Sequence, residues 1–276
     1  MFKIFVIIII AVGIFFWYPT SGDPIKKEIL SPTTPHSVQL PPAEHSKATV
    51  FLLSILPPKQ TWPDSIQKIW LSLNIEEAVQ ERTNDIEWVP ITDIPIEMQQ
   101  ALLAIEDHNF YNHGAIDVDG ILRATLVNIT AGEVVQGGST ITQQLTKNLF
   151  LSQEQTLIRK TEEALLSLVM EQHYSKDQLL EIYFNTTYFG AGATGIKSAA
   201  LTYFDKLPQE MQLAECAIIA ALPYAPSALN PLENPEGCKK RQRLVLQTMV
   251  KRGYIGTTLA EKTSAEPVFL ANGATF

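Results

Sequence analysis

From residue 96 onward, apolar residues recur at helical spacing and predict a mainly α-helical domain. Met98, Leu102 and Ile105 stand at i, i+4 and i+7, which places them on one face of a helix. Capping residues and glycines delimit the segments that follow. Strand signals are few after residue 88. The helices that this pattern predicts cover 96–105, 117–132, 140–151, 157–173, 175–185, 209–222 and 236–252.

Two of these predicted helices carry a marked apolar stripe, and a glycine-rich segment separates two others. The stripes are Leu122, Leu126 and Ile129 on the second helix, and Leu165, Leu168 and Val169 on the fourth. Glycine adopts backbone conformations that other residues avoid. The sequence therefore predicts a loop with tight chain approach at Gly190, Gly192 and Gly195.

The N-terminus carries an unbroken apolar segment at 4–18. Its 15 residues are fewer than the roughly 20 that comfortably span a bilayer. No small-x-small cleavage site follows, and Trp17 and Tyr18 are typical of a membrane interface. We expect residues 1–18 to form an uncleaved transmembrane signal anchor, with the apolar region of a cleaved signal as the alternative.

Composition then divides the rest of the chain. Residues 19–45 are rich in proline and polar residues, which is typical of an extended stalk on the extracytoplasmic side. Residues 46–87 form an N-terminal extension that we leave unassigned, because the pattern of 64–90 fits neither helix nor strand clearly. The main domain is expected at 88–276.

Charge and cysteine content exclude several classes of protein. The net charge is −8 and the pI is near 5.2, so the chain lacks the basic footprint of a nucleic-acid-binding protein. Cys216 lies in an apolar run and is most simply a small buried hydrophobe. Neither Cys216 nor Cys238 has metal-ligand spacing to a histidine, and two cysteines make no disulfide framework. A single bridge between them stays open.

Candidate chemistry begins with the carboxylates Glu106 and Asp107 at the end of the first predicted helix. The helix dipole disfavours anions at that end, and this tends to raise the pKa of a carboxyl group. A raised pKa suits a proton-transferring residue. The alternative is a solvated acidic helix end.

Two further runs combine groups that suit a phosphate. Gly138-Ser139-Thr140 at a helix start can present N–H groups and hydroxyls to an anion, although glycines also mark ordinary turns. Arg159 and Lys160 lie within one helical turn of Glu163. These three residues are either a surface ion pair or the cationic edge of a cleft.

Four motifs in order give a specific resemblance. The chain resembles the peptidoglycan glycosyltransferase domain, glycosyltransferase family 51, over about 60% of its length. It is most similar to the monofunctional type and to the same domain of bifunctional penicillin-binding proteins, and a truncated relative stays open. The motifs are Glu-Asp-x-x-Phe-x-x-His-Gly at 106–114, Gly-Gly-Ser-Thr-Ile-Thr-Gln-Gln-Leu-x-Lys-Asn at 137–148, Arg-Lys-x-x-Glu at 159–163 and Tyr-Ser-Lys-Asp-x-x-Leu-Glu-x-Tyr-x-Asn at 174–185.

The resemblance implies a mainly α, two-lobed fold with a lysozyme-like large lobe and a smaller membrane-facing lobe. It implies polymerisation of lipid II into β-1,4 glycan strands, with inversion at the donor sugar. Glu106 matches the general base, and Glu163 matches a second catalytic carboxylate that assists the leaving group or orients its neighbours. The implied substrate-binding residues are Asp107, Phe110, His113, Gly138, Ser139, Thr140, Gln143, Gln144, Lys147, Asn148, Arg159 and Lys160. Among them, Phe110 and His113, with Gly114, are expected mainly to shape the loop behind Glu106.

Within that set, Lys147, Arg159 and Lys160 would neutralise the lipid pyrophosphate, while the hydroxyls and amides would hold sugar and phosphate oxygens. No metal ligands are predicted and no tightly bound cofactor, but a divalent cation, Mg or Mn, suits the charge of the substrate. The implied partners are lipid II, lipid-linked glycan, the cytoplasmic membrane and other cell-wall synthesis proteins. The domain is expected at the periplasmic face of the inner membrane, tethered by a single pass.

Two other functions stay open. One is a lysozyme-like, glycan-cleaving enzyme, against which Gln143-Gln144 and the Arg159-Lys160…Glu163 motif speak. A sugar alkoxide leaves poorly and needs an acid, whereas pyrophosphate leaves without one when cations meet its charge. The other is an inactive cell-wall scaffold that binds lipid II.

Overall fold

A computed structural model describes residues 64–132 and 137–276, all of which belong to one of the two units of the chain, Ser37–Phe276. The expected anchor at 1–18 and stalk at 19–45 lie outside the described residues. In the part that is described, no helix combines the length and apolarity that crossing a membrane requires.

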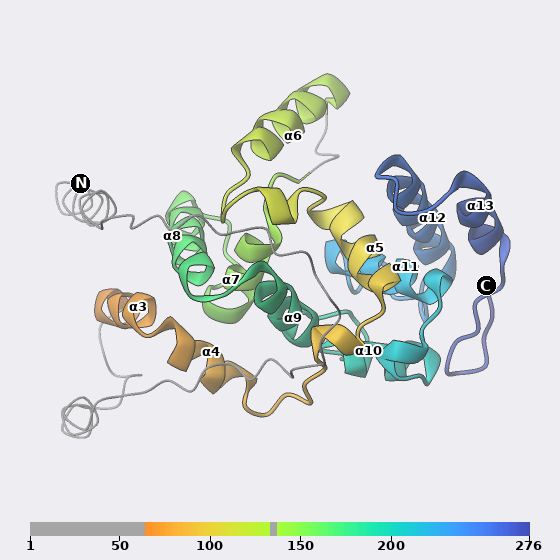
Figure 1. Cartoon of the computed structure of the whole chain (residues 1–276), viewed down its shortest axis with the longest axis horizontal. Helices are drawn as coiled ribbons and strands as arrows, with labels where there is room; N and C mark the ends of the chain where they lie inside the picture. The colour runs from red at the N-terminus through yellow and green to blue at the C-terminus, as the bar shows by residue number, and fades with distance from the viewer. Residues whose placement is uncertain (1–63, 133–136) are drawn as a thin grey trace, which may run out of the picture. The chain divides into compact units, whose positions relative to one another are not determined.

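The described residues confirm a mainly α-helical domain (Figure 1). Extended structure there is limited to two isolated bridges, Tyr188 with Thr194 and Phe269 with Thr275. Four short 3₁₀ helices lie between the α-helices: η2 (Ile91–Asp93), η3 (Phe110–Asn112), η4 (Pro208–Glu210) and η5 (Leu222–Tyr224). The α-helices are α3 (Asp64–Leu73), α4 (Ile75–Thr83), α5 (Ile96–Glu106), α6 (Val118–Ala131), α7 (Ile141–Phe150), α8 (Leu157–His173), α9 (Lys176–Thr186), α10 (Ile196–Phe204), α11 (Leu213–Ala221), α12 (Pro235–Lys251) and α13 (Thr257–Ala265).

The expected caps define several of these helices. The Asp117 side chain accepts the N–H of Gly120 and begins α6, which ends at Gly132 in the left-handed conformation. Thr140 and Gln143 form a capping box at the start of α7, and Ser175 caps α9 in the same way. These local hydrogen bonds explain why the predicted helix limits agree closely with the observed ones.

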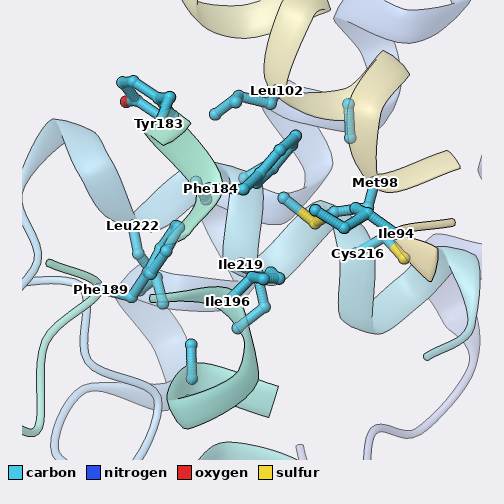
Figure 2. Close-up of a cluster of buried hydrophobic side chains, with 14 of the residues drawn as sticks. Ile94, Met98, Leu102, Tyr183, Phe184, Phe189, Ile196, Cys216, Ile219 and Leu222 are labelled. Carbon is cyan, nitrogen blue, oxygen red and sulfur yellow. The ribbon is translucent and has the colours of Figure 1, made fainter. Parts of the chain in front are cut away.

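Two groups of packed helices position the site. Helix α5 packs against α11 and α12, and α7 packs against α8 and α9 (Figure 1). Their buried side chains form one hydrophobic cluster, part of which is shown in Figure 2. Met98 and Leu102 of α5 contribute to it, as do Phe184 of α9 and Ile219 of α11. The ends of α5 and α7 are thereby anchored on a rigid core.

The apolar stripe of helix α6 faces outward. Leu122, Leu126 and Ile129 are 59%, 67% and 72% exposed. The buried residues of α6 are the small Gly120 and Ala124, and Gly138, just before α7, packs beside Ala124. A Cβ atom on Gly138 would lie 3.1 Å from the Cα of Ile121, so glycine permits this close approach. The stripe expected on helix 157–173 is also partly exposed, at Leu165 and Leu168.

The glycine-rich loop has the predicted tight geometry. Gly190, Gly192 and Gly195 all have positive φ angles, of 89°, 76° and 83°. A Cβ atom on Gly190 would lie 2.5 Å from the carbonyl oxygen of Pro226. This loop therefore needs glycine for its backbone conformation and for its packing.

Candidate active site

Glu106 is the last residue of α5, and its carboxylate faces the first turns of α7. Gln144 Nε2 donates to Glu106 Oε2 at 2.8 Å. The Tyr183 hydroxyl of α9 donates to Gln144 Oε1 at 3.0 Å. The carboxylate that the sequence singles out is thus held by side chains of two further helices.

Burial raises the pKa of the Glu106 carboxyl above its ordinary value. The hydrogen bond from Gln144 and the positive charges of Arg241 and Lys147 lower the pKa in part, whereas Asp107 raises it. The direction of the shift is as expected from the sequence. Its main cause, however, is loss of contact with water, not the position at the helix end.

Asp107 ties the end of α5 to the start of α7. Its carboxylate accepts a hydrogen bond from the backbone N–H of Ile141 at 3.0 Å and contacts His113 Nε2 at 2.7 Å. His113 Nδ1 lies 2.6 Å from the carbonyl oxygen of Gly114. Both of these oxygens accept hydrogen bonds, so the two contacts favour the charged form of His113, in which both ring nitrogens carry protons. Asp107 and His113 therefore brace the loop behind Glu106.

Replacing His113 with Gln is expected to lower stability at acidic pH and to matter less as the pH rises. Burial lowers the pKa of His113, but the bonds to Asp107 and Gly114 raise it more, so the folded pKa lies above 6.5. The resulting stabilisation, about 1–2 kcal/mol, is fully present below the unfolded pKa and is lost as the pH rises through the folded pKa. Melting temperatures between about pH 5 and about pH 9 measure this.

His108 provides the matched control, since burial lowers its pKa. Its contribution has the opposite sign, present above the unfolded pKa and lost as the pH falls through the folded pKa. His108→Gln should therefore gain stability relative to the wild type on acidification. A His113→Gln deficit that is constant over the whole pH range would contradict the charged pair.

The donors at the start of α7 are used within the protein. The N–H of Ile141 is bonded to Asp107, and that of Thr140 to the Gln143 side chain at 3.1 Å. The Thr140 hydroxyl donates to the carbonyl of Ala115 at 2.7 Å. The N–H and the hydroxyl of Thr140 therefore bond within the protein, and binding of a substrate anion by Gly138 and Ser139 of the same run stays a prediction.

Glu163 lies on α8, is 2% exposed, and holds two cations. Arg159 Nη1 contacts Glu163 Oε2 at 2.6 Å, and Lys160 Nζ contacts Glu163 Oε1. Lys160 Nζ also donates to the Ser139 hydroxyl at 2.8 Å. Both carboxylate oxygens of Glu163 are thus occupied by cationic groups. This geometry suits a residue that orients its neighbours.

Two pockets meet between these clusters. The first, of about 460 Å³, is lined by Glu106 and by residues of α6 and α12. The second, of about 430 Å³, is lined by Lys147, Arg159, Lys160 and Glu163. Ser139 and Gln144 line both pockets. The two pockets are therefore adjacent, and Gln144, which bonds Glu106, lies between them.

The first pocket contains arginines that the motif analysis missed. Arg123 comes from α6, and Arg241 and Arg252 from the C-terminal helix region. The Arg241 guanidinium lies 4.1 Å from the centre of the Tyr224 ring. The basic run at 239–243 is apparent in the sequence. Only the fold shows that Arg241 is the residue of this run that lines the pocket of Glu106.

Some of the predicted binding residues do not line either pocket. Phe110 is buried in the core, with Lys176 Nζ 4.4 Å from its ring centre, and Gln143 is buried within the capping box. His113 and Asn148 also lie outside the linings. Gly138 lines the first pocket through its backbone. Cys216 and Cys238 are buried, and both are free thiols.

Among the described residues, no group of three or more His, Cys, Asp or Glu side chains is placed to hold a metal ion.

Comparisons with known proteins show the family of this chain. The sequence model of the family described as Transglycosylase matches residues 55–250. Penicillin-binding protein 1A of Aquifex aeolicus is 46% identical over 66% of this chain and 25% of its own length. Penicillin-binding protein 1F of Bacillus subtilis is 43% identical over 66% of this chain and 26% of its own length. The chain belongs to the transglycosylase family.

A solved structure is also similar. The crystal structure is that of penicillin-binding protein 1A from Haemophilus influenzae. The matched region spans 67% of this chain and 18% of the Haemophilus chain, with 24% sequence identity and a TM-score of 0.42. The chain spans about a quarter of the length of the curated relatives that it matches.

Proposed function

We propose that this chain is a membrane-anchored peptidoglycan glycosyltransferase that polymerises lipid II into β-1,4 glycan strands. One observation carries the proposal: a pocket with a partly buried carboxylate and a pocket with three cations share the wall formed by Ser139 and Gln144. That arrangement suits a reaction between a hydroxyl and a sugar pyrophosphate. Family membership and the two-lobed, lysozyme-like fold of the family are consistent with it.

In this proposal the second pocket binds the donor. Lys147, Arg159 and Lys160 meet the charge of its pyrophosphate, which leaves from the anomeric carbon. Glu163 fixes Arg159 and Lys160 in place. Arg159 Nε is buried and has no hydrogen-bond partner among the described residues, so a phosphate oxygen would relieve an unsatisfied donor.

The first pocket binds the acceptor. Glu106 takes the proton of the acceptor sugar's 4-hydroxyl as that oxygen attacks the donor, and the α-linked pyrophosphate is replaced by a β-linked sugar. A base must be ionised, and a raised pKa brings its strength closer to the operating pH. Arg123, Arg241 and Arg252 face the anionic groups of the acceptor.

Exposed apolar residues on α6 and at the start of α8 fit a membrane-facing lobe. Leu157 of α8 is 89% exposed and Ile158 is 68% exposed. Large exposed apolar patches mark interaction surfaces. We propose that this side faces the outer surface of the cytoplasmic membrane, where lipid II is presented, with residues 1–18 as the tether.

Binding of a divalent cation also stays a prediction. The described residues do not fit a dedicated metal site, because Glu163 is engaged with two cations and Glu106 with Gln144. Any Mg or Mn ion would have to be held mainly by the phosphates of the substrate.

The test is incubation of the full chain, in detergent or vesicles, with labelled lipid II, followed by separation of the products by size. The proposal predicts a ladder of glycan strands. Cleavage of preformed glycan without extension of lipid II would identify a lysozyme-like enzyme. Binding of lipid II with neither reaction would identify a scaffold.

Replacing Arg241 with Gln is expected to move the acid limb of the activity profile to higher pH. The positive charge of Arg241 lowers the pKa of Glu106, so removal of that charge raises this pKa further. Activity should fall near neutrality and recover as the pH rises. The pH dependence of initial polymerisation rates measures this.

Arg243→Gln is the matched control, because Arg243 is exposed on the same helix and lies outside the pocket. Its profile should equal that of the wild type. Equal acid-limb shifts in both variants would show that Arg241 has no specific effect on Glu106.

A further inference from the structure

The Glu106 carboxylate ends a chain of partly buried hydrogen bonds that the mechanism above does not use. The chain runs from Tyr183 of α9 through Gln144 of α7 to Glu106 of α5, with heavy-atom distances of 3.0 and 2.8 Å. Tyr183 is fully buried. Figure 2 shows it at the margin of the core cluster, with its hydroxyl directed away from the other labelled side chains.

The direction of each hydrogen bond follows from chemistry. An ionised carboxylate only accepts, so Gln144 must turn its amide nitrogen toward Glu106. The amide oxygen then faces Tyr183, whose hydroxyl has to donate. Burial raises the pKa of Tyr183 well above 10, so this hydroxyl keeps its proton. The opposite amide orientation would place a carbonyl oxygen against the carboxylate and would favour protonated Glu106.

We propose that Tyr183 is a positioning residue that fixes the Gln144 amide and thereby holds Glu106 ionised, with its Oε1 atom free for the acceptor's proton. Gln144 engages only Oε2, and within the described residues Oε1 makes no hydrogen bond. Glu106 also lines the first pocket, where the acceptor would lie. The inference rests on the proposed role of Glu106 as the base.

Other groups act on Glu106 without fixing its orientation. Arg241 of α12, Lys147 of α7 and the neighbouring Asp107 affect it through their charges, and none of them forms a hydrogen bond with it. Thr187 lies beside the Tyr183 hydroxyl, and its Oγ1 does not meet hydrogen-bond geometry with any described group. Gln144 is therefore the one acceptor that the Tyr183 hydroxyl reaches at hydrogen-bond distance among the described residues.

The test is Tyr183→Phe, which removes one hydroxyl and leaves the aromatic ring in the core. The pKa of Glu106 should rise by about one pH unit, because the Gln144 amide can then turn. Polymerisation should fall about tenfold on the acid side and recover at higher pH, while KM for lipid II changes little. Carbon-13 NMR titration of the Glu106 carboxyl, assigned with Glu106→Gln, reads the same change without turnover.

A second variant shows whether Tyr183 acts through Gln144. In a Gln144→Met background the amide is absent, so adding Tyr183→Phe should leave the Glu106 titration unchanged. Tyr203→Phe is the matched control, since Tyr203 is equally buried but donates to the carbonyl of Phe189. That variant should titrate like the wild type.

An unchanged Glu106 titration in Tyr183→Phe would overturn the inference, even if the melting temperature falls. So would an equal rise in the Gln144→Met background. Neither result would affect the proposed polymerase. Conversely, if lipid II is not extended but the titration moves as expected, the positioning role of Tyr183 stands and the proposed function fails.

Discussion

Glu106→Gln should reduce lipid II polymerisation by about 10²–10⁴-fold, the usual contribution of a general base. The substitution keeps the shape of the side chain and an oxygen that can accept from Gln144 Nε2, so the fold around α5 should be retained. What is lost is the ability to accept the proton of the attacking hydroxyl. Initial rates with labelled lipid II, together with melting temperatures, measure both expectations.

The matched control is Glu97→Gln. Glu97 is an exposed carboxylate in the first turn of the same helix, away from both pockets. Its removal should leave the rate within about twofold of the wild type, since surface substitutions have small effects. Substantial polymerisation by Glu106→Gln would contradict the assignment of the base.

Glu163→Gln is expected to have the second largest effect, on both activity and stability. The change leaves Arg159 and Lys160 without the carboxylate that holds them. Loss of preorganised charge at a leaving group costs on the order of 10²-fold in rate. Breaking a fully buried pair costs about 3–5 kcal/mol. Because Lys160 is 43% exposed, we expect about 2–3 kcal/mol in the free energy of unfolding.

Separate measurements distinguish a misfolded variant from a disordered donor site. Inhibition by inorganic pyrophosphate should weaken in Glu163→Gln at temperatures well below its melting transition. Glu162→Gln is the control, because Glu162 pairs with Lys68 outside the pockets. Unchanged pyrophosphate inhibition in Glu163→Gln would show that this carboxylate does not order the donor-binding cations.

The limits of the central helices could be predicted because their signals are local. The Asp117 cap, the Thr140–Gln143 capping box and the Gly132 terminus each depend on residues within one turn. Helices α3, α4, α10 and α13 were not predicted. The pattern of 64–90 was ambiguous. Helix α10 packs against α9 and α11, and these tertiary contacts cannot be read from its sequence.

In the site too, local features could be predicted from the sequence and tertiary contacts could not. The pairing of Lys160 with Glu163 follows from helical spacing, and the structure confirms it. The burial that raises the pKa of Glu106 depends on three helices meeting, and no local pattern reveals it. For the same reason the hydrogen bond from the start of α7 to Asp107, which also lines the first pocket, could not be read from the sequence. Arg241 and Tyr183 became visible only when α12 and α9 were placed beside α5.

The exposure of Leu122, Leu126 and Ile129 could not be read from their spacing, because a stripe on a helix predicts an apolar face but not what covers it.

The most direct test of the central claim is the fate of the bond between the anomeric carbon and the pyrophosphate of lipid II in a single reaction of the full chain. Released lipid pyrophosphate, new glycosidic linkages and free disaccharide are quantified together, and the linkage configuration is read by NMR. A glycosyltransferase with Glu106 as its base should release one lipid pyrophosphate for each new β linkage, with negligible free disaccharide. Release of lipid pyrophosphate with an equal amount of free disaccharide, or no release at all, would contradict the account.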